Sequence, residues 1–160
     1  MKNSTTIFVS GGTAGHVFSA NGMAYYSKTR NIMITDARGE KFVNKELFDE
    51  VHIISIKNKI FKNFFSFLKS FFESWKIISK YKSSIIVGFG AYVSVPPSII
   101  GWVRGKKIYI YQADQIIGRA NNLLVRISQK MFTASFNIKN KKGKVILENV
   151  TANSNFSTLL

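Results

Sequence analysis

Residues 10–16 read Ser-Gly-Gly-Thr-Ala-Gly-His and directly follow the apolar run 7–9. Glycines at the end of a strand let the backbone bend tightly, and they let N–H groups approach a ligand without a Cβ in the way. A helix that begins near His16 would add its positive amino end, so the turn has the composition of an anion or nucleotide site. His16 is also a candidate general base, because an imidazole titrates near neutral pH.

A second turn of the same kind follows the apolar run 85–87 and reads Gly-Phe-Gly-Ala-Tyr-Val-Ser over residues 88–94. The carboxyl ends of parallel strands meet at one edge of a sheet. We therefore expect the two turns to border one cleft, in which their backbone N–H groups converge on a diphosphate. Glycines that only make tight turns are the structural alternative.

The dinucleotide fingerprint G-x-G-x-x-G is matched in part, because Gly12 and Gly15 fit it while Ser10 replaces its first glycine. Asp36 ends the second expected strand, near the place where that fingerprint has an acidic residue for a ribose hydroxyl. A small NAD-binding domain that uses Gly12, Gly15 and Asp36 is therefore an open alternative.

Short apolar runs alternate with helical patterns, which is typical of an α/β fold: a Rossmann-like parallel sheet with helices on both faces. Residues 1–150 are expected to form this domain, and residues 151–160 a degenerate tail. The helical segments are 16–27, 60–81, 92–103 and 118–128. The expected strands are Thr5–Val9, Asn31–Thr35, Val51–Ile56, Ser84–Val87, Lys107–Tyr111, Lys130–Ala134 and Lys144–Leu147.

The chain has 160 residues, which suits one domain, and 46% of them are apolar, which is enough for a buried core. It contains no cysteine, which excludes disulfides and cysteine-ligated metals, and no other cluster of metal ligands stands out, so no metal site is expected. No uncharged apolar stretch is long enough to span a bilayer.

The net charge of +15 favours an anionic partner, which is nucleic acid, a membrane surface or a phosphorylated ligand. Compositional drift toward lysine would explain part of the same charge. No nucleic-acid-binding motif accompanies it, so nucleic acid is not an expected partner.

Three segments, in the same order and spacing, resemble the N-terminal domain of the MurG family: Gly11–Phe18, Thr35–Gly39 and Val87–Ser94. The resemblance implies one half of a two-domain GT-B glycosyltransferase, which moves N-acetylglucosamine from UDP-GlcNAc to undecaprenyl-diphosphate-linked MurNAc-pentapeptide in peptidoglycan synthesis. In that family the N-terminal half binds the lipid-linked acceptor and the C-terminal half binds most of the donor. No cofactor is implied beyond UDP-GlcNAc as donor substrate.

The resemblance also implies roles for single residues. His16 is the candidate base that takes the proton from the acceptor hydroxyl. Contacts to the donor or its diphosphate are implied for Gly12, Thr13, Ala14, Gly15 and Asp114, and contacts to the acceptor for Gly88, Gly90, Ala91, Tyr92 and Ser94. His52, inside an apolar strand, is expected to be structural.

The sequence departs from the family pattern at five positions. Ala14, Ala91 and Val95 stand where the family usually has glycine, and each added side chain narrows the approach of a phosphate. Gln112 stands where the family has a carboxylate. Asp114 replaces an amide and places a negative charge where the donor diphosphate should lie, which is unfavourable unless a cation intervenes.

The segment 60–78 predicts a helix with a wide aromatic arc and lysines on its other side. One edge of this arc is expected to pack in the core. The other edge is expected to lie on an anionic membrane, because aromatic side chains edged by lysines suit the headgroup layer, and the resembling family has its membrane-facing patch here. The residues expected at the membrane are Phe64, Phe67, Phe71, Trp75, Lys62 and Lys69.

These features together predict the acceptor half of a lipid-linked N-acetylglucosaminyltransferase, peripheral to the cytoplasmic face of the bacterial inner membrane. A separate donor-domain polypeptide is expected as a partner, because the sequence ends where the family's donor domain would begin. The main alternative is a non-catalytic relative that still binds membrane or a lipid diphosphate.

Overall fold

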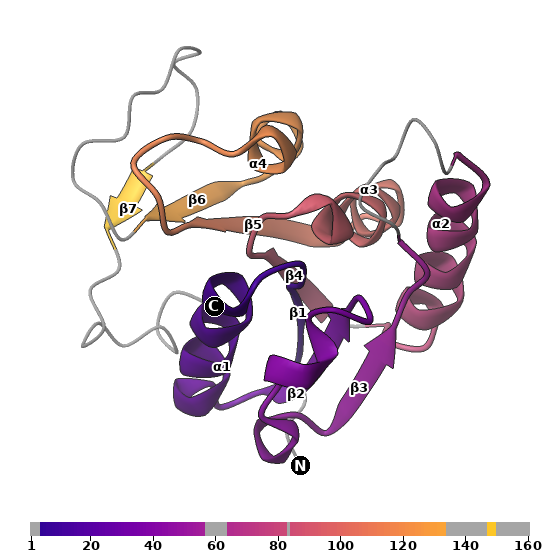
Figure 1. The fold of residues 1–160 in the computed structure, drawn as a ribbon, viewed down its shortest axis with the longest axis horizontal. Coiled ribbons are helices and arrows are strands. Elements are labelled where there is room, and N and C mark those ends of the chain that lie inside the picture. The colour runs from indigo at the N-terminus through magenta and orange to yellow at the C-terminus, as the bar shows by residue number, and fades with distance from the viewer. Residues whose placement is uncertain (1–3, 57–63, 83, 134–146, 150–160) are drawn as a thin grey trace.

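The structure is a computed structural model, and it describes residues 4–56, 64–82, 84–133 and 147–149. These residues form a sheet of seven strands in the order β3-β2-β1-β4-β5-β6-β7, with every neighbouring pair parallel (Figure 1). The strands are β1 Thr5–Val9, β2 Arg30–Thr35, β3 Glu50–Ile53, β4 Ser84–Gly88, β5 Lys107–Gln112, β6 Lys130–Thr133 and β7 Leu147–Asn149.

Helices cover both faces of the sheet. Helix α1 (Ala14–Tyr26) lies on one face, and α2 (Phe64–Ser79), α3 (Val95–Val103) and α4 (Arg119–Leu124) lie on the other (Figure 1). Three short 3-10 helices complete the connections: η1 Glu40–Phe42, η2 Lys45–Leu47 and η4 Tyr92–Ser94. The expected Rossmann-like α/β fold is therefore confirmed.

Strand β1 is covered on both faces of the sheet, which explains why its residues 7–9 are all apolar. Phe8 points to the α1 face and packs with Val17, whereas Ile7 and Val9 point to the other face and pack with Ile78 of α2. These three apolar residues have no exposed surface. A parallel strand that is covered on both faces has no solvent side to mark with a polar residue.

The structure changes several expected boundaries. The segment expected as one helix over 92–103 is split into η4 and α3, and Pro96 and Pro97 lie in the first turn of α3, where a missing N–H costs nothing. The helix expected over 118–128 is the shorter α4. The last strand expected at 144–147 is instead β7, which ends at Asn149. The tail 151–160 lies outside the described residues.

Candidate functional site

The two glycine turns leave the adjacent strands β1 and β4 at the carboxyl edge of the sheet and contact each other. The N–H of Phe89 donates to the carbonyl oxygen of Val9 at 2.9 Å, which joins the two strand ends. A Cβ built on Gly90 would lie 3.3 Å from Cε1 of His16, and one built on Gly12 would lie 3.3 Å from the Cβ of Ala91. The expectation that the two turns border one site is confirmed, and His16 lies where they meet.

Two cavities flank this meeting point, with volumes of about 200 Å³ and about 180 Å³. His16, Ala91 and Tyr92 line both of them and form the wall between them. The remaining walls differ. The larger cavity is also lined by Gly90, Tyr111, Asp114, Arg119 and Asn121, and the smaller one by Gly12, Thr13, Arg38, Ile56 and Val93.

Three residues of the turns have a left-handed backbone, at φ +79° for Gly12, +85° for Gly90 and +54° for Ala91. Glycine adopts this conformation without a steric penalty. Ala91 does not, and its ψ of 160° places it in a region that glycine occupies almost alone. The structure therefore gives a backbone reason for the glycine that the MurG family has at this position.

Some of the N–H groups expected to hold a diphosphate are already used within the protein. The N–H of Gly12 donates to Oδ1 of Asp36 at 3.0 Å, and the N–H of Thr13 donates to the carbonyl of Gly11 at 2.9 Å. Among the described residues, no acceptor pairs with the N–H groups of Ala14, Gly15 and His16 in the first turn of α1, or with those of Gly90 and Ala91. These five N–H groups are among the donors available to an anion.

Thr13 and Gly15 leave room for a ligand at the start of α1. Thr13 is the N-cap residue, yet its hydroxyl makes no capping hydrogen bond and stays exposed. A Cβ built on Gly15 would meet nothing within 4 Å. The space next to the free N–H groups is thus open, as the implied phosphate contact requires.

Asp36 has a structural role that the sequence did not reveal. It is buried, with 1% of its surface exposed, and its Oδ1 accepts from the N–H groups of Gly12 and Gly39 at 3.0 and 2.8 Å. Its Oδ2 accepts from the Arg38 guanidinium at 2.9 Å. Both carboxylate oxygens are thus occupied in holding the first turn. The NAD-binding alternative, in which Asp36 binds a ribose hydroxyl, is not supported.

The electrostatic setting of His16 favours its neutral form. Burial lowers the pKa of His16 below its usual 6.5, and attraction by the Asp114 carboxylate offsets part of that effect. A neutral imidazole at pH 7 is the form that can accept a proton. Asp114 is exposed at the mouth of the larger cavity, which puts its negative charge beside His16.

Gln112 shapes the loop that carries Asp114. Its side-chain amide donates to the carbonyls of Asp114 and Ile116 at 3.1 and 2.9 Å, and its oxygen accepts from Asn121 Nδ2 at 2.9 Å. A carboxylate cannot donate to two carbonyls. The replacement of the family's carboxylate by Gln112 is therefore matched to the loop that this chain builds.

Two residues of the larger cavity were missed by the sequence reasoning. Arg119, the first residue of α4, is exposed and supplies a cation at the cavity wall. Asn121 is buried, and its Oδ1 has no hydrogen-bond partner, although its Nδ2 is bonded twice. Neither residue belongs to a glycine turn, and their polarity near Gly118 is the only signal of them in the sequence.

Gly88 and Ser94 do not reach either cavity. Both are buried, and a Cβ built on Gly88 would lie 3.3 Å from the Cβ of Ser94, so this glycine allows η4 and α3 to pack closely on β4. The hydroxyl of Ser94 donates to the carbonyl of Ala91 at 2.8 Å. The sequence assigned both residues a contact with the acceptor. Both instead have a packing role, because they are buried and line neither cavity.

Helix α2 buries Ser70, Ser74, Ile77 and Ile78 and leaves several of its aromatic residues exposed. Ser70 and Ser74 are fully buried, whereas Phe65 is 86% exposed and Phe72 is 60% exposed. Phe67 and Phe71 are half-buried, with ring centroids 5.1 Å apart. We call the exposed set on α2 and the neighbouring α3 the aromatic surface: Phe65, Leu68, Phe72, Trp75 and Trp102.

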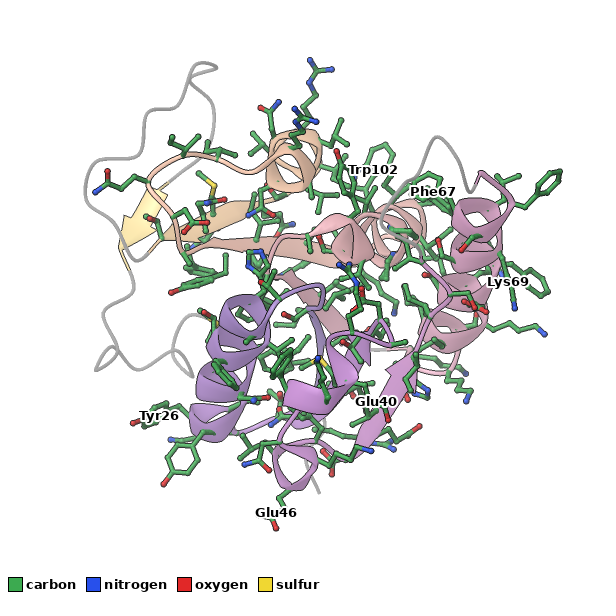
Figure 2. The ribbon with its side chains drawn as sticks, in the orientation of Figure 1. Tyr26, Glu40, Glu46, Phe67, Lys69 and Trp102 are labelled. Atoms are coloured by element: carbon green, nitrogen blue, oxygen red, sulfur yellow. The ribbon has the colours of Figure 1, made fainter. Side chains whose placement is uncertain are left out.

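The aromatic surface agrees only in part with the residues that the sequence analysis expected at the membrane. Trp75 is exposed as expected, but Phe67 and Phe71 lie at the inner margin, because Ser70 and Ser74 set which side of α2 approaches α3. In Figure 2, Phe67 lies between α2 and α3, and Lys69 lies on the outer side of α2. Lys62 and the side chain of Phe64 lie outside the described residues.

His52 has the structural role expected of it. Its Nε2 is 2.9 Å from the hydroxyl of Tyr81 and 3.2 Å from Glu50, and burial lowers its pKa. The described residues contain no group of three or more histidine, aspartate or glutamate side chains placed to hold a metal ion. Within the same residues, no helix combines the length and the hydropathy needed to cross a membrane.

Comparisons with known proteins agree with this geometry. Residues 6–133 match the glycosyltransferase family 28 N-terminal domain. The chain is 31% identical over 134 residues to the UDP-N-acetylglucosamine--N-acetylmuramyl-(pentapeptide) pyrophosphoryl-undecaprenol N-acetylglucosamine transferase of Agrobacterium fabrum, covering 78% of this chain and 35% of the relative. It is 32% identical over 134 residues to the enzyme of the same name from Rhizobium rhizogenes, covering 78% and 36%. The chain thus spans about a third of the length of these relatives.

A solved structure shares the fold. The crystal structure of MurG from Acinetobacter baumannii superimposes with a TM-score of 0.73 at 20% identity, over 89% of this chain and 44% of that one. A UDP-N-acetylglucosamine 2-epimerase from Rickettsia bellii superimposes with a TM-score of 0.62 at 14% identity, over 85% and 40%. At these identities the structural likeness concerns the fold.

Proposed function

The chain belongs to the glycosyltransferase family 28 N-terminal domain family, and on this premise we propose that it is the acceptor-binding half of an N-acetylglucosaminyltransferase of peptidoglycan synthesis. The acceptor would be undecaprenyl-diphosphate-linked MurNAc-pentapeptide, and the donor UDP-GlcNAc, in line with the names of its relatives. The donor-binding half lies outside these 160 residues, in a further stretch of chain or in a separate polypeptide.

One observation carries the proposal: two glycine turns from adjacent strands meet around His16. The meeting point brings a half-buried imidazole, five free backbone N–H groups and two cavities into one place. Transfer of a sugar with inversion needs a base at the acceptor hydroxyl and donors that stabilise the departing diphosphate. Here His16 would supply the base, and the free N–H groups would supply the hydrogen-bond donors.

His16 acts as the base in this proposal. Its neutral ring takes the proton of the acceptor hydroxyl as the oxygen attacks the anomeric carbon of the sugar, while the bond from that carbon to the UDP oxygen breaks. Attraction by Asp114 stabilises the imidazolium that forms, because the carboxylate favours the charged ring. In this way Asp114 supports proton transfer rather than binding the diphosphate directly.

The diphosphates are held by N–H groups and cations in this proposal. The free N–H groups of Gly15 and His16 lie at the positive end of α1, and those of Gly90 and Ala91 lie on the facing turn. Arg119 borders the larger cavity and Arg38 the smaller one. Arg38 is already paired with Asp36, so Arg119 is the cation that offsets the negative charge of Asp114, with which it lines the larger cavity.

The aromatic surface would place the protein on the cytoplasmic face of the bacterial inner membrane, as a peripheral protein bound to anionic lipid. Trp75 and Phe72 carry cations over their rings: Arg104 is 4.7 Å from the Trp75 centroid, and Lys76 is 4.5 Å from the Phe72 centroid. Exposed aromatic rings with cations at their edge suit the boundary between headgroups and acyl chains.

The test is transfer of labelled N-acetylglucosamine to lipid I, with and without a co-expressed donor-domain polypeptide. We expect transfer only with the donor half, and a loss of about 100-fold or more in rate for His16→Gln. His52→Gln is the matched control, because His52 is the other histidine and lies away from both cavities. Transfer that His16→Gln leaves unchanged would remove His16 from the mechanism.

A binding measurement separates this proposal from the non-catalytic alternative. The transferase requires saturable binding of undecaprenyl diphosphate, which Gly90→Val should abolish by filling the space next to the His16 ring. Binding without transfer, in the presence of the donor half, would favour the non-catalytic protein. Absence of binding would exclude the transferase, and of the non-catalytic alternative it would leave a protein that binds the membrane alone.

A further inference from the structure

A cavity of about 540 Å³ lies at the opposite edge of the sheet from His16. Its lining includes Thr5, Ser84 and Lys107, the first residues of the adjacent strands β1, β4 and β5. We call it the amino-edge cavity. It is larger than either cavity at His16, and its volume is in the range of small-molecule sites. Ligands of doubly wound sheets usually bind at the carboxyl edge, so this cavity is not part of the site described above.

The amino-edge cavity is strongly basic. Five of its lining residues are cations, and none is acidic: Lys28, Lys82, Arg104, Lys106 and Lys107. Within the described part of the chain, none of these five lies within 4 Å of a carboxylate. Their positive charge is therefore uncompensated by the protein, although four other lysine, arginine and histidine side chains pair with acidic groups elsewhere in the fold at 3.2 Å or less.

Two of the cations are held in place by the fold. The ammonium of Lys106 donates to the carbonyl oxygens of Tyr81 and Lys82, and burial, with Arg104 close by, lowers the pKa of Lys106. The guanidinium of Arg104 lies over the ring of Trp75. These contacts fix two charges at the cavity wall before any ligand binds.

The other three cations are not held by contacts within the protein. The side chains of Lys28, Lys82 and Lys107 are exposed and make no hydrogen bond, ion pair or ring contact within the described residues. Lys28 and Lys82 precede β2 and β4, and Lys107 is the first residue of β5, so the sheet brings them together from distant parts of the sequence. Hydroxyl groups of Thr5, Ser27 and Ser84 lie among them.

We propose that the amino-edge cavity binds a ligand that bears two or more phosphate groups. Five cations without carboxylate partners match the several negative charges of such a ligand. The cavity volume suits a small molecule or a headgroup. The proposal does not rest on the transferase activity, and the two can fail separately.

The test is calorimetric titration of the full chain with sodium triphosphate. We expect Lys82→Gln/Lys107→Gln to weaken binding about tenfold or more, because two of five charges are lost. Lys41→Gln/Lys45→Gln removes the same charge from exposed residues outside the cavity, and we expect a change of about twofold or less. Equal dissociation constants for the two double variants, or no saturable binding to the wild-type chain, would overturn the proposal.

Two further measurements locate the site and the source of the phosphate. The chain has two tryptophans, so Trp102→Phe leaves Trp75, beneath Arg104, to report on the cavity by its fluorescence. Titration with triphosphate should change the Trp75 emission with the same dissociation constant as the calorimetric titration. His16→Gln should leave that dissociation constant unchanged. Displacement of triphosphate by short-chain cardiolipin, whose headgroup bears two phosphates, would identify a lipid headgroup as the natural source, and failure to displace it a soluble phosphorylated ligand.

Discussion

Replacement of Ala91 by glycine should stabilise this protein, although the change removes a methyl group. Ala91 is the described residue other than glycine that has a positive φ, at φ 54° and ψ 160°. A side chain in this region costs free energy because its Cβ crowds the neighbouring backbone. Glycine has no Cβ, so Ala91→Gly removes that cost without any change in the fold.

The expected gain follows from three contributions. Relief of the backbone strain is worth about 2 kcal/mol in the free energy of unfolding. The greater freedom of glycine in the unfolded chain takes back about 0.7 kcal/mol, and loss of a half-buried methyl takes back about 0.4 kcal/mol. The net stabilisation is about 1 kcal/mol, which raises the Tm of a chain of this size by about 3 °C.

The assay is thermal unfolding followed by circular dichroism, checked by chemical denaturation. Ala14→Gly is the matched control, because Ala14 also stands where the family usually has glycine but lies in the first turn of α1 with an ordinary helical backbone. There, glycine should lower the stability by up to about 1 kcal/mol. If Ala91→Gly lowers Tm as Ala14→Gly does, the strain assigned to Ala91 does not exist.

Three further predictions concern other parts of the structure. Burial lowers the pKa of both His16 and His52, so the folded state binds fewer protons than the unfolded state and the free energy of unfolding should fall as the pH drops below about 6.5; His16→Gln should flatten this pH dependence in chemical denaturation. Asp36→Asn should destabilise the chain by about 2 kcal/mol in the same assay, because the amide cannot accept both from the Gly12 turn and from the Arg38 guanidinium. Phe72→Ser/Trp75→Ser should abolish sedimentation with phosphatidylglycerol vesicles, whereas Phe18→Ser/Tyr25→Ser, which removes equally exposed rings from α1, should not.

The fold was largely readable from the sequence because each strand is short, apolar and bounded by a turn. Strand β1 is predicted at Thr5–Val9 and is found there, because a short apolar run that is bounded by turns is typical of a strand buried on both faces. The helix boundaries predicted from the sequence are less accurate than the strand positions. Tyr92–Val103 reads as one helix, but the turn at Ala91 leads first into η4, and only Val95 begins α3.

The site was predictable where it depends on backbone, and not where it depends on side chains from distant segments. The two glycine turns identified the edge of the sheet and the neighbourhood of His16. The sequence did not reveal that Asp36 holds the first turn, or that Asn121 brings an unpaired oxygen to the cavity wall. Those roles arise from contacts between residues far apart in the chain, which no local pattern encodes.

Helix α2 shows why the direction of an amphipathic helix cannot be read from hydropathy alone. A helix usually buries its largest apolar side chains, but here Ser70 and Ser74 face the protein, and their hydroxyls donate to carbonyls one turn or less earlier in the same helix. Small side chains let α2 lie close to α3, and the aromatic residues are left in water. Folding gains little from Phe65 or Phe72, whereas a bilayer surface would bury them at about 25 cal/mol for each Å² of apolar area. The helix therefore packs on the core through Ser70, Ser74, Ile77 and Ile78 and leaves its aromatic residues exposed, which is the arrangement expected of a protein that completes its burial on a membrane.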